Sequence, residues 1–336
     1  MIRLDYQPWG ESLAELADAA RRAEDAGAGV VWAPELHRSA PIAAAALISG
    51  TTTVGVGTGV ALAFARSPMV TALTALDLDE LSGGRFRLGL GSGVRKLIGD
   101  WHGVPFDPPV ARLRDTVAAI RAVIAGAHLG DPIVHSGETS IAVRGWRRPH
   151  APVRERIPIH LAAVGPAMTA LAGEIGDGWL SHELCPADHL AETVLPMLRR
   201  GSARTGNRPE VVVSACCSVD ADAGLARDRA RGVVGFYASV KSYAELFAGA
   251  GFAAEHEATV AALRNGAAAD ALRDGVPPEM AAAFTLSGTR DDAAAGIARY
   301  RGLADAIKLS PPTHGLAPAE IRAAQDAVID LIRELA

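Results

Sequence analysis

The feature that most constrains the fold is a strand–helix–strand pattern within residues 54–95. A run rich in valine and glycine, Val54–Thr58, and a second apolar run, Phe86–Leu90, each end at glycine, as strands often do. The segment Ser67–Leu81 between them has helical spacing and begins with an N-cap serine followed by proline at N1. Parallel strands joined by a helix bind ligands at their carboxyl ends, so we expect a site at this edge.

The same alternation continues along the chain and predicts an α/β protein, a (β/α)8 TIM barrel formed by residues 1–336 as one domain. The expected strands are Ile2–Leu4, Val30–Trp32, Val54–Thr58, Phe86–Leu90, Ile157–Leu161, Gly178–Ser181, Val211–Val219 and Ala306–Ser310. Insertions are expected after strands 4 and 7. After strand 4, Ser92–Pro109 is interpreted as a long loop and Ile133–Val143 as a hairpin. After strand 7, residues 241–283 lack a strand pattern, which indicates a helical insertion, either a lid over the barrel mouth or a peripheral layer.

Composition limits the class of function. The formal net charge of −5 lacks the basic footprint of a nucleic-acid-binding protein. No apolar run reaches the roughly 18 residues of a membrane span, and the first residues show no secretory signal pattern. The cysteines, Cys185, Cys216 and Cys217, are too few for a disulfide framework. We therefore expect a cytoplasmic protein that acts on a small molecule, and we assign no metal ligands.

Two glycine clusters, Gly55/Gly57/Gly59 and Gly89/Gly91/Gly93, raise the question of a dinucleotide-binding fold. Neither cluster has the G-x-G-x-x-G spacing, and neither follows the first strand. No acidic residue ends the next strand, where it would bind a ribose. We therefore exclude NAD binding of the Rossmann type.

Three segments carry a resemblance to a known family: LAELADAARRAEDAGAGVVWAPE, AFARSPMV…LSGGRFRLGLGSG and IPIHLAAVGPAMTALAGEIGDGWL. They resemble the luciferase-like flavin and deazaflavin oxidoreductases. The branch that uses coenzyme F420 is the most similar, and it includes methylenetetrahydromethanopterin reductase and F420-dependent glucose-6-phosphate dehydrogenase. The resemblance extends over nearly the whole chain, apart from residues 241–283.

The resemblance implies an oxidoreductase that transfers a hydride between F420 and a small organic substrate. In the resembled family, the peptide at the position of Gly59-Val60 is a non-prolyl cis bond that supports the deazaflavin ring. The resemblance also implies that the F420 phosphate is held by Ser92 and Gly93 together with the turn after strand 5, which comprises Val164, Gly165, Pro166, Ala167 and Met168. That turn begins a helix, where backbone N–H groups and the helix dipole favour an anion.

Candidate catalytic residues follow strand 2. In the resembled family, a histidine or an acidic residue at the position of His37 lies near the reactive edge of the deazaflavin. His37 is therefore the predicted proton donor, and Glu35 is predicted to orient it or to shape the pocket. The alternative is that His37 is an ordinary loop residue.

Further pocket residues are expected after other strands on the same face. His182 follows strand 6 and is the second candidate for a proton donor, and Asp5 follows strand 1 and is a candidate for cofactor binding. Trp101 and His102 either line the substrate side or pack against the barrel rim.

One position departs from the family pattern. The sugar-phosphate dehydrogenases have a catalytic glutamate directly after the strand-4 glycine turn, whereas this chain has Val94 followed by Arg95. The substitution disfavours sugar-phosphate oxidation and favours reduction of a C=C, C=N or C=O bond. Two alternatives stay open: an FMN-dependent two-component monooxygenase of the same fold, and a catalytically silent binding homologue. Family habit also implies a homodimer.

Overall fold

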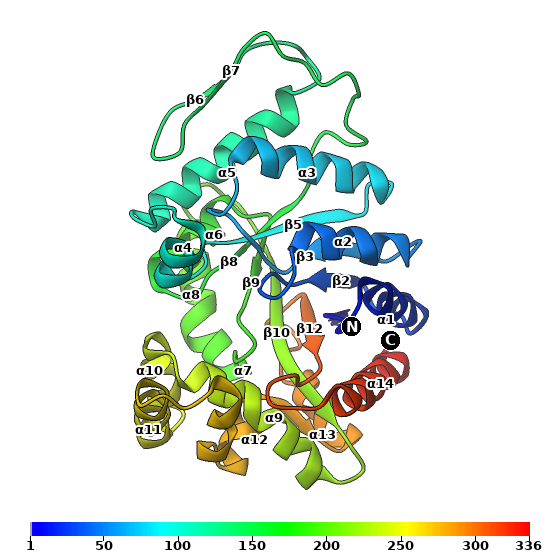
Figure 1. Cartoon of the computed structure of the whole chain (residues 1–336), viewed down its shortest axis with the longest axis vertical. Coiled ribbons are helices and arrows are strands. Elements are labelled where there is room, and N and C mark those ends of the chain that lie inside the picture. The colour runs from blue at the N-terminus through cyan, green and yellow to red at the C-terminus, as the bar shows by residue number, and fades with distance from the viewer. Residues whose placement is uncertain (1) are drawn as a thin grey trace.

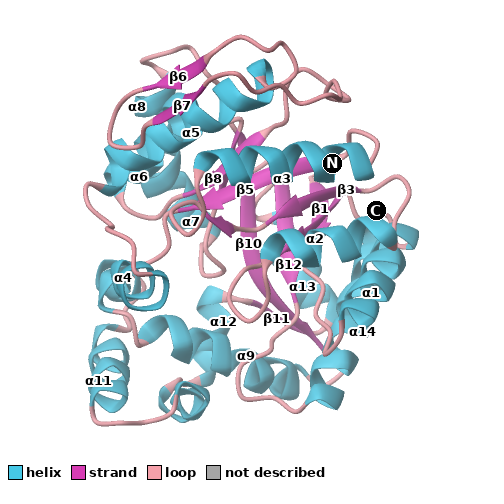
Figure 2. Ribbon diagram, turned by 45° about the horizontal axis from the view of Figure 1, so that its top comes forward, coloured by secondary structure: helices cyan, strands magenta, loops and turns pink. Residues whose placement is uncertain are grey.

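The computed structural model describes residues 2–336 and confirms the (β/α)8 barrel. Its strands are β1 (Arg3–Tyr6), β2 (Val30–Ala33), β3 (Gly55–Thr58), β5 (Phe86–Gly91), β8 (Ile159–Ala162), β9 (Gly178–Leu180), β10 (Glu210–Val219) and β12 (Ala306–Ser310). They pair in parallel in the order β10-β12-β1-β2-β3-β5-β8-β9, and pairing of β9 with β10 closes the ring. Figure 2 shows the strands at the centre with helices around them.

The helices that surround the barrel begin where the sequence indicates. They are α1 (Leu13–Asp25), α2 (Ala40–Ser49), α3 (Pro68–Leu81), α5 (Pro109–Gly126), α6 (Pro166–Ile175), α7 (Ala187–His189), the π-helical turn η1 (Leu190–Val194), α8 (Leu195–Ser202), α9 (Ala223–Ala238), α13 (Arg290–Ala298) and α14 (Pro318–Leu335). The hydroxyls of Ser12 and Ser67 accept hydrogen bonds from the third residues of α1 and α3, which satisfies backbone donors at those helix starts. The main apolar core lies between these helices and the strands.

Three elements differ from the sequence-based expectation. A short strand, β4 (Ala61–Leu62), follows β3 and pairs with β5. The loop predicted between Ser92 and Pro109 contains a helix, α4 (Arg95–His102), so that part of the prediction is wrong. Leu97, Ile98 and Trp101 have helical spacing, but the eight residues of α4 are fewer than the roughly 11 that are needed to establish a helical period. A short strand, β11 (Leu286–Gly288), was also missed, and it pairs with the end of β10 outside the barrel.

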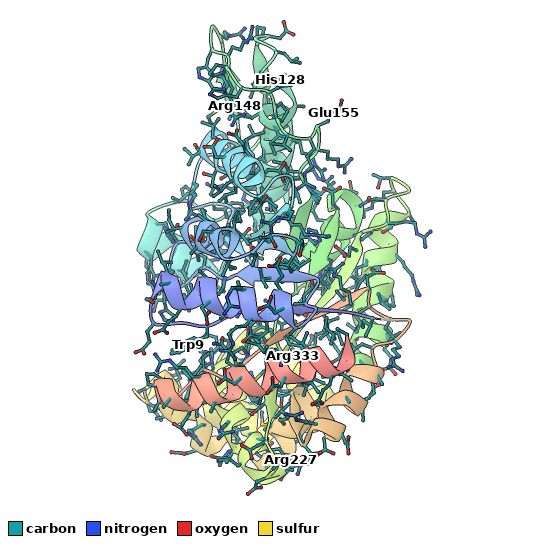
Figure 3. The ribbon with its side chains drawn as sticks, turned by 90° about the vertical axis from the view of Figure 1, so that its right-hand side faces the viewer. Trp9, His128, Arg148, Glu155, Arg227 and Arg333 are labelled. Carbon is teal, nitrogen blue, oxygen red and sulfur yellow. The ribbon has the colours of Figure 1, made fainter. Side chains whose placement is uncertain are left out.

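Both expected insertions are present as ordered structure. After β5 the strands β6 (Ile133–His135) and β7 (Ile141–Val143) form an antiparallel hairpin. After α9 the chain forms η2 (Lys241–Tyr243), α10 (Ala244–Gly249), α11 (Ala253–Arg264), η3 (Ala269–Gly275) and α12 (Pro278–Phe284). The two insertions lie at opposite ends of the long axis of the molecule (Figure 1). Figure 3 shows His128 and Arg148 at the hairpin end and Arg227 at the other.

The helical insertion is attached to α9 by its own apolar cluster. Val233 and Val234 of α9 pack there with Phe247, Met280 and Phe284 of the insertion. None of the helices described between residues 2 and 336 is long and apolar enough to cross a membrane. The three cysteines are free and buried.

The amino-terminal end of the barrel is filled by an ionic network around Glu210. This carboxylate accepts hydrogen bonds from Arg87 (2.7 Å) and from Arg3, and it lies 2.8 Å from Nε2 of His160. Burial opposes its charge, but His160 and the two arginines hold the pKa of Glu210 well below its ordinary value. Trp32 and other apolar side chains from neighbouring strands lie above this layer. Any cavity inside the barrel must therefore open at the other end.

Candidate active site

A pocket of about 750 Å³ lies at the carboxyl ends of the strands. Residues from seven of the barrel strands, or from the segments just after them, line it, and residues from α9, η2 and α10 form the side toward the insertion. The strand-end residues include Gln7, Glu35, Leu36, Gly59, Val60, Gly91, Ser92, Gly93, Val94, Ala162, Val164, Gly165, Pro166, Met168, His182, Glu183 and Lys308. Those from the other side include Phe236, Tyr237, Ser242, Tyr243, Glu245 and Leu246. The first part of the insertion therefore forms pocket wall.

The peptide between Gly59 and Val60 is cis, which confirms that prediction. Val60 lines the pocket. A Cβ added at position 91 would lie 2.8 Å from Cγ2 of Val60, so this arrangement requires glycine at position 91. Likewise, a Cβ at position 57 would lie 2.5 Å from the ring of Trp32. Gly57 and Gly91 thus make room for protein side chains.

The start of α6 offers free backbone donors to the pocket. Gly165 is its N-cap, and no side chain there accepts a hydrogen bond from the helix. The amides of Ala167 and Met168 have no intrahelical acceptor, and a Cβ at position 165 would meet no atom within 4 Å. Ser92 and Gly93 line the same pocket, so the two segments assigned to phosphate binding lie in one cavity.

Four of the five residues of that turn line the pocket. These are Val164, Gly165, Pro166 and Met168, whereas the side chain of Ala167 is exposed and does not contribute to the lining. An uncapped helix start beside a cavity of this volume has the donors and the room for a phosphate-bearing ring cofactor. The arrangement fits F420 and also FMN.

Glu35 lines the pocket and links two neighbouring segments by hydrogen bonds. Its carboxylate accepts hydrogen bonds from both terminal nitrogens of Arg66 and, at 2.7 Å, from the backbone N–H of Leu62. Burial disfavours the charge, but Arg66 and the backbone donors keep the pKa of Glu35 below its ordinary value. Glu35 therefore stays ionised and fixes the segment after the cis peptide, a shaping role that the sequence allowed for.

His37 is not brought to the pocket. Its side chain is exposed, and it does not belong to the lining, although its neighbours Glu35 and Leu36 do. Trp101 and His102 on α4 are also exposed and lie outside the lining. Asp5 is fully buried inside the barrel, where it accepts hydrogen bonds from Arg3 (2.7 and 2.9 Å) and from Nε1 of Trp32 (3.0 Å). None of these side chains lines the pocket.

His182 does face the pocket, inside a group of aromatic rings. Its ring centroid lies 4.9 Å from that of Tyr243 and 5.7 Å from that of Tyr237. Burial, with a smaller contribution from His189, lowers the pKa of His182 to about 3. Its Nδ1 accepts a hydrogen bond from the N–H of Leu184 (3.2 Å), so the neutral ring presents Nε2–H as a donor. His182 can orient a ligand but does not carry a charge near neutral pH.

Two polar residues of the pocket lining, Gln7 and Lys308, were not predicted from the sequence, and neither was Ser310, which bonds to the lining residue Glu183. Nζ of Lys308 donates to Oε1 of Gln7 at 2.7 Å, and Oγ of Ser310 donates to Oε1 of Glu183 at 2.6 Å. Burial lowers the pKa of Lys308, while Glu183 and Asp5 act against that effect. A lysine within the apolar strand AIKLS was the sequence signal for this group, since buried lysines are rare.

Comparison with known proteins places this site in a family context. Residues 2–306 match the family model described as luciferase-like monooxygenase. The chain is 29% identical to 5,10-methylenetetrahydromethanopterin reductase of Methanolobus tindarius, with 88% of each protein covered. It is 35% identical to a Mycobacterium tuberculosis protein named as a candidate coenzyme F420-dependent oxidoreductase, covering 74% of this chain and 72% of that protein.

Solved structures share the fold. The coenzyme F420-dependent tetrahydromethanopterin reductase of Methanopyrus kandleri superposes with a TM-score of 0.81 at 22% identity, over 99% of this chain and 97% of that one. The oxygenating constituent of 3,6-diketocamphane monooxygenase of Pseudomonas putida, in complex with FMN, gives 0.68 at 14% identity, over 99% of each chain. The same barrel thus serves proteins with either cofactor.

Proposed function

Because the chain belongs to the luciferase-like monooxygenase family, we propose that it is an F420-dependent oxidoreductase that transfers hydride from the reduced deazaflavin to a small organic substrate. The acceptor would be a C=C, C=N or C=O bond. The F420-dependent relatives support F420 as the cofactor. Val94, which replaces the catalytic glutamate of the sugar-phosphate dehydrogenases, supports hydride transfer from the cofactor to the substrate. By family habit we further propose a homodimer, which sedimentation analysis would test.

One observation carries this proposal: Gly59 and Val60 line the same pocket as the uncapped start of α6. Val60 would support the ring, and the amides of Ala167 and Met168 with the Ser92–Gly93 turn would hold the phosphate. When bound, the cofactor supplies the hydride. The aromatic wall formed by Phe236, Tyr237 and Tyr243, and the neutral donor on His182, would exclude water and orient the substrate.

The test is a fluorescence titration of the purified protein with F420 and, separately, with FMN. We expect F420 to bind at least tenfold more tightly, since its phosphate-linked tail continues past the α6 start as an anion. Tighter binding of FMN would replace this proposal with the flavin monooxygenase, for which the camphane monooxygenase structure is the precedent. Failure of both cofactors to bind would indicate the silent binding homologue.

A further inference from the structure

Lysine is a rare residue in this chain, and one lysine lies at the floor of the pocket. The sequence has thirty arginines but only three lysines, Lys96, Lys241 and Lys308. Lys96 and Lys241 are exposed, whereas Lys308 is 5% exposed in the middle of β12. No arginine among the described residues lines the pocket. The ammonium of Lys308 is therefore the one permanently basic group that this part of the structure presents to a pocket occupant.

The ammonium of Lys308 has N–H groups that are not engaged in hydrogen bonds within the described residues. An ammonium group carries three N–H bonds. Within residues 2–336 the only hydrogen-bond acceptor found for Nζ is Oε1 of Gln7, at 2.7 Å. Asp5, the register partner of Lys308 on β1, is already bonded to Arg3 and Trp32. Glu183 is engaged by Ser310. A buried cation with unused donors at the edge of a cavity favours an electron-rich oxygen or nitrogen.

We propose that Lys308 is the proton donor to the substrate, and that the substrate is a carbonyl, imine or carbonyl-conjugated compound whose oxygen or nitrogen contacts Nζ. This inference rests on the proposed hydride transfer. As the carbon accepts hydride, the π electrons of the C=O or C=N bond move onto the heteroatom. One N–H bond of Lys308 breaks and its proton joins that atom, giving an alcohol or amine, or an enol for a conjugated substrate. The neutral lysine then regains a proton from solvent.

Neighbouring groups position this donor. Gln7 fixes the direction of Nζ, and the charges of Glu183 and Asp5 favour the ammonium form against burial. The other titratable groups around Glu183 include His182, which is neutral, and Tyr237, Tyr243 and Cys216, whose pKa values are raised by burial. The protonated lysine is thus the acid available at the floor. A lowered pKa makes it a stronger acid than an exposed lysine.

The test uses 4-nitrophenol, a planar probe that ionises near neutral pH and whose anion is coloured. Next to the ammonium, the bound probe should ionise more readily, with the phenolate-to-phenol ratio raised roughly tenfold over free solution. Lys308→Met keeps the length of the side chain and should abolish this increase. Lys96→Met is the matched control and should retain it. A bound probe with unchanged ionisation in the wild type, or an increase that survives in Lys308→Met, overturns the proposal.

A second measurement needs no variant that could misfold. In protein labelled with ¹⁵N at lysine Nζ, the probe should shift the Lys308 signal while the signals of Lys96 and Lys241 stay in place. An unmoved Lys308 signal at millimolar probe overturns the inference. Neither measurement contains F420, so a negative result for the Lys308 proposal can be told apart from a negative result of the F420 titration. A probe response without F420 binding would retain the Lys308 subsite and remove the proposed hydride donor.

Discussion

Replacing Gly165 with aspartate should weaken F420 binding without harming the fold. The backbone of Gly165 has φ −74° and ψ 156°, which any residue adopts, and a Cβ there meets no atom within 4 Å. An aspartate at an N-cap accepts hydrogen bonds from the first helical amides, so α6 itself should gain stability. The same carboxylate would occupy the donors proposed for the phosphate and would repel that phosphate.

The size of the effect follows from Coulomb's law. Two unit charges about 4 Å apart repel by about 1 kcal/mol in bulk water and by about 4 kcal/mol near a protein surface. The turn is exposed, so we expect a repulsion below the upper limit of that range, at about 1–3 kcal/mol. This corresponds to a Kd for F420 that rises roughly 5- to 150-fold, and the loss should shrink as salt is added.

The assay is a fluorescence titration at low and high ionic strength, paired with thermal unfolding. Gly249→Asp is the matched control, because Gly249 is exposed and its Cβ would also meet nothing. The control should bind F420 like the wild type. An unchanged Kd in Gly165→Asp, with both proteins folded, would show that the phosphate does not sit at the start of α6.

The remaining predictions concern two histidines and one carboxylate. Because His37 is exposed and outside the pocket lining, His37→Ala should keep a hydride-transfer rate within about threefold of the wild-type rate. A loss of tenfold or more, which is typical of a general acid, would restore His37 as the proton donor. His182 stays neutral because its pKa is lowered to about 3, so His182→Asn should leave the shape of the pH–rate profile between pH 6 and 8 unchanged. Loss of a limb of that profile in the variant would contradict the neutral state of His182. Glu24 accepts hydrogen bonds from the backbone N–H groups of Thr53 and Val54, which hold its pKa at about 2 although burial opposes its charge. The stabilising effect of the Glu24 carboxylate is therefore complete above its ordinary pKa and is lost as pH falls from about 4.5 to about 2. Glu24→Gln should lower the free energy of unfolding at pH 7 by about 1 kcal/mol and should flatten its dependence on acid pH, as measured by urea titration. A variant whose stability falls with pH in parallel with the wild type would contradict this role.

Strands and caps could be predicted because their signals are local. The run Ala306–Ser310 has the bounds of β12, and Ser67-Pro68 starts α3 as expected. The helix α4 was missed because its eight residues are too few to establish a helical period, although Leu97, Ile98 and Trp101 have the spacing of one. β11 was missed because three residues that pair with the end of another strand carry no signal of their own.

The site divides in the same way. The Gly59-Val60 bond and the α6 turn were predicted because they belong to contiguous segments that resemble a family. The wall formed by Tyr237 of α9 and Tyr243 of the insertion depends on how that insertion packs against α9, which no local pattern encodes. His37 shows the opposite failure. Its position after a strand was predicted, but the direction of a side chain in a loop does not follow from spacing.

The ionic network around Glu210 also has a consequence for steady-state kinetics. Because Glu210, Arg3, Arg87 and His160 fill the amino-terminal end of the barrel, ligands reach the described pocket from the carboxyl ends of the strands. A molecule at Lys308 and a molecule at the start of α6 then share that approach, because both positions line the same pocket. Arrival and departure cannot be independent, so initial-rate measurements should give the patterns of an ordered sequence, with product release and cofactor exchange competing for the same route.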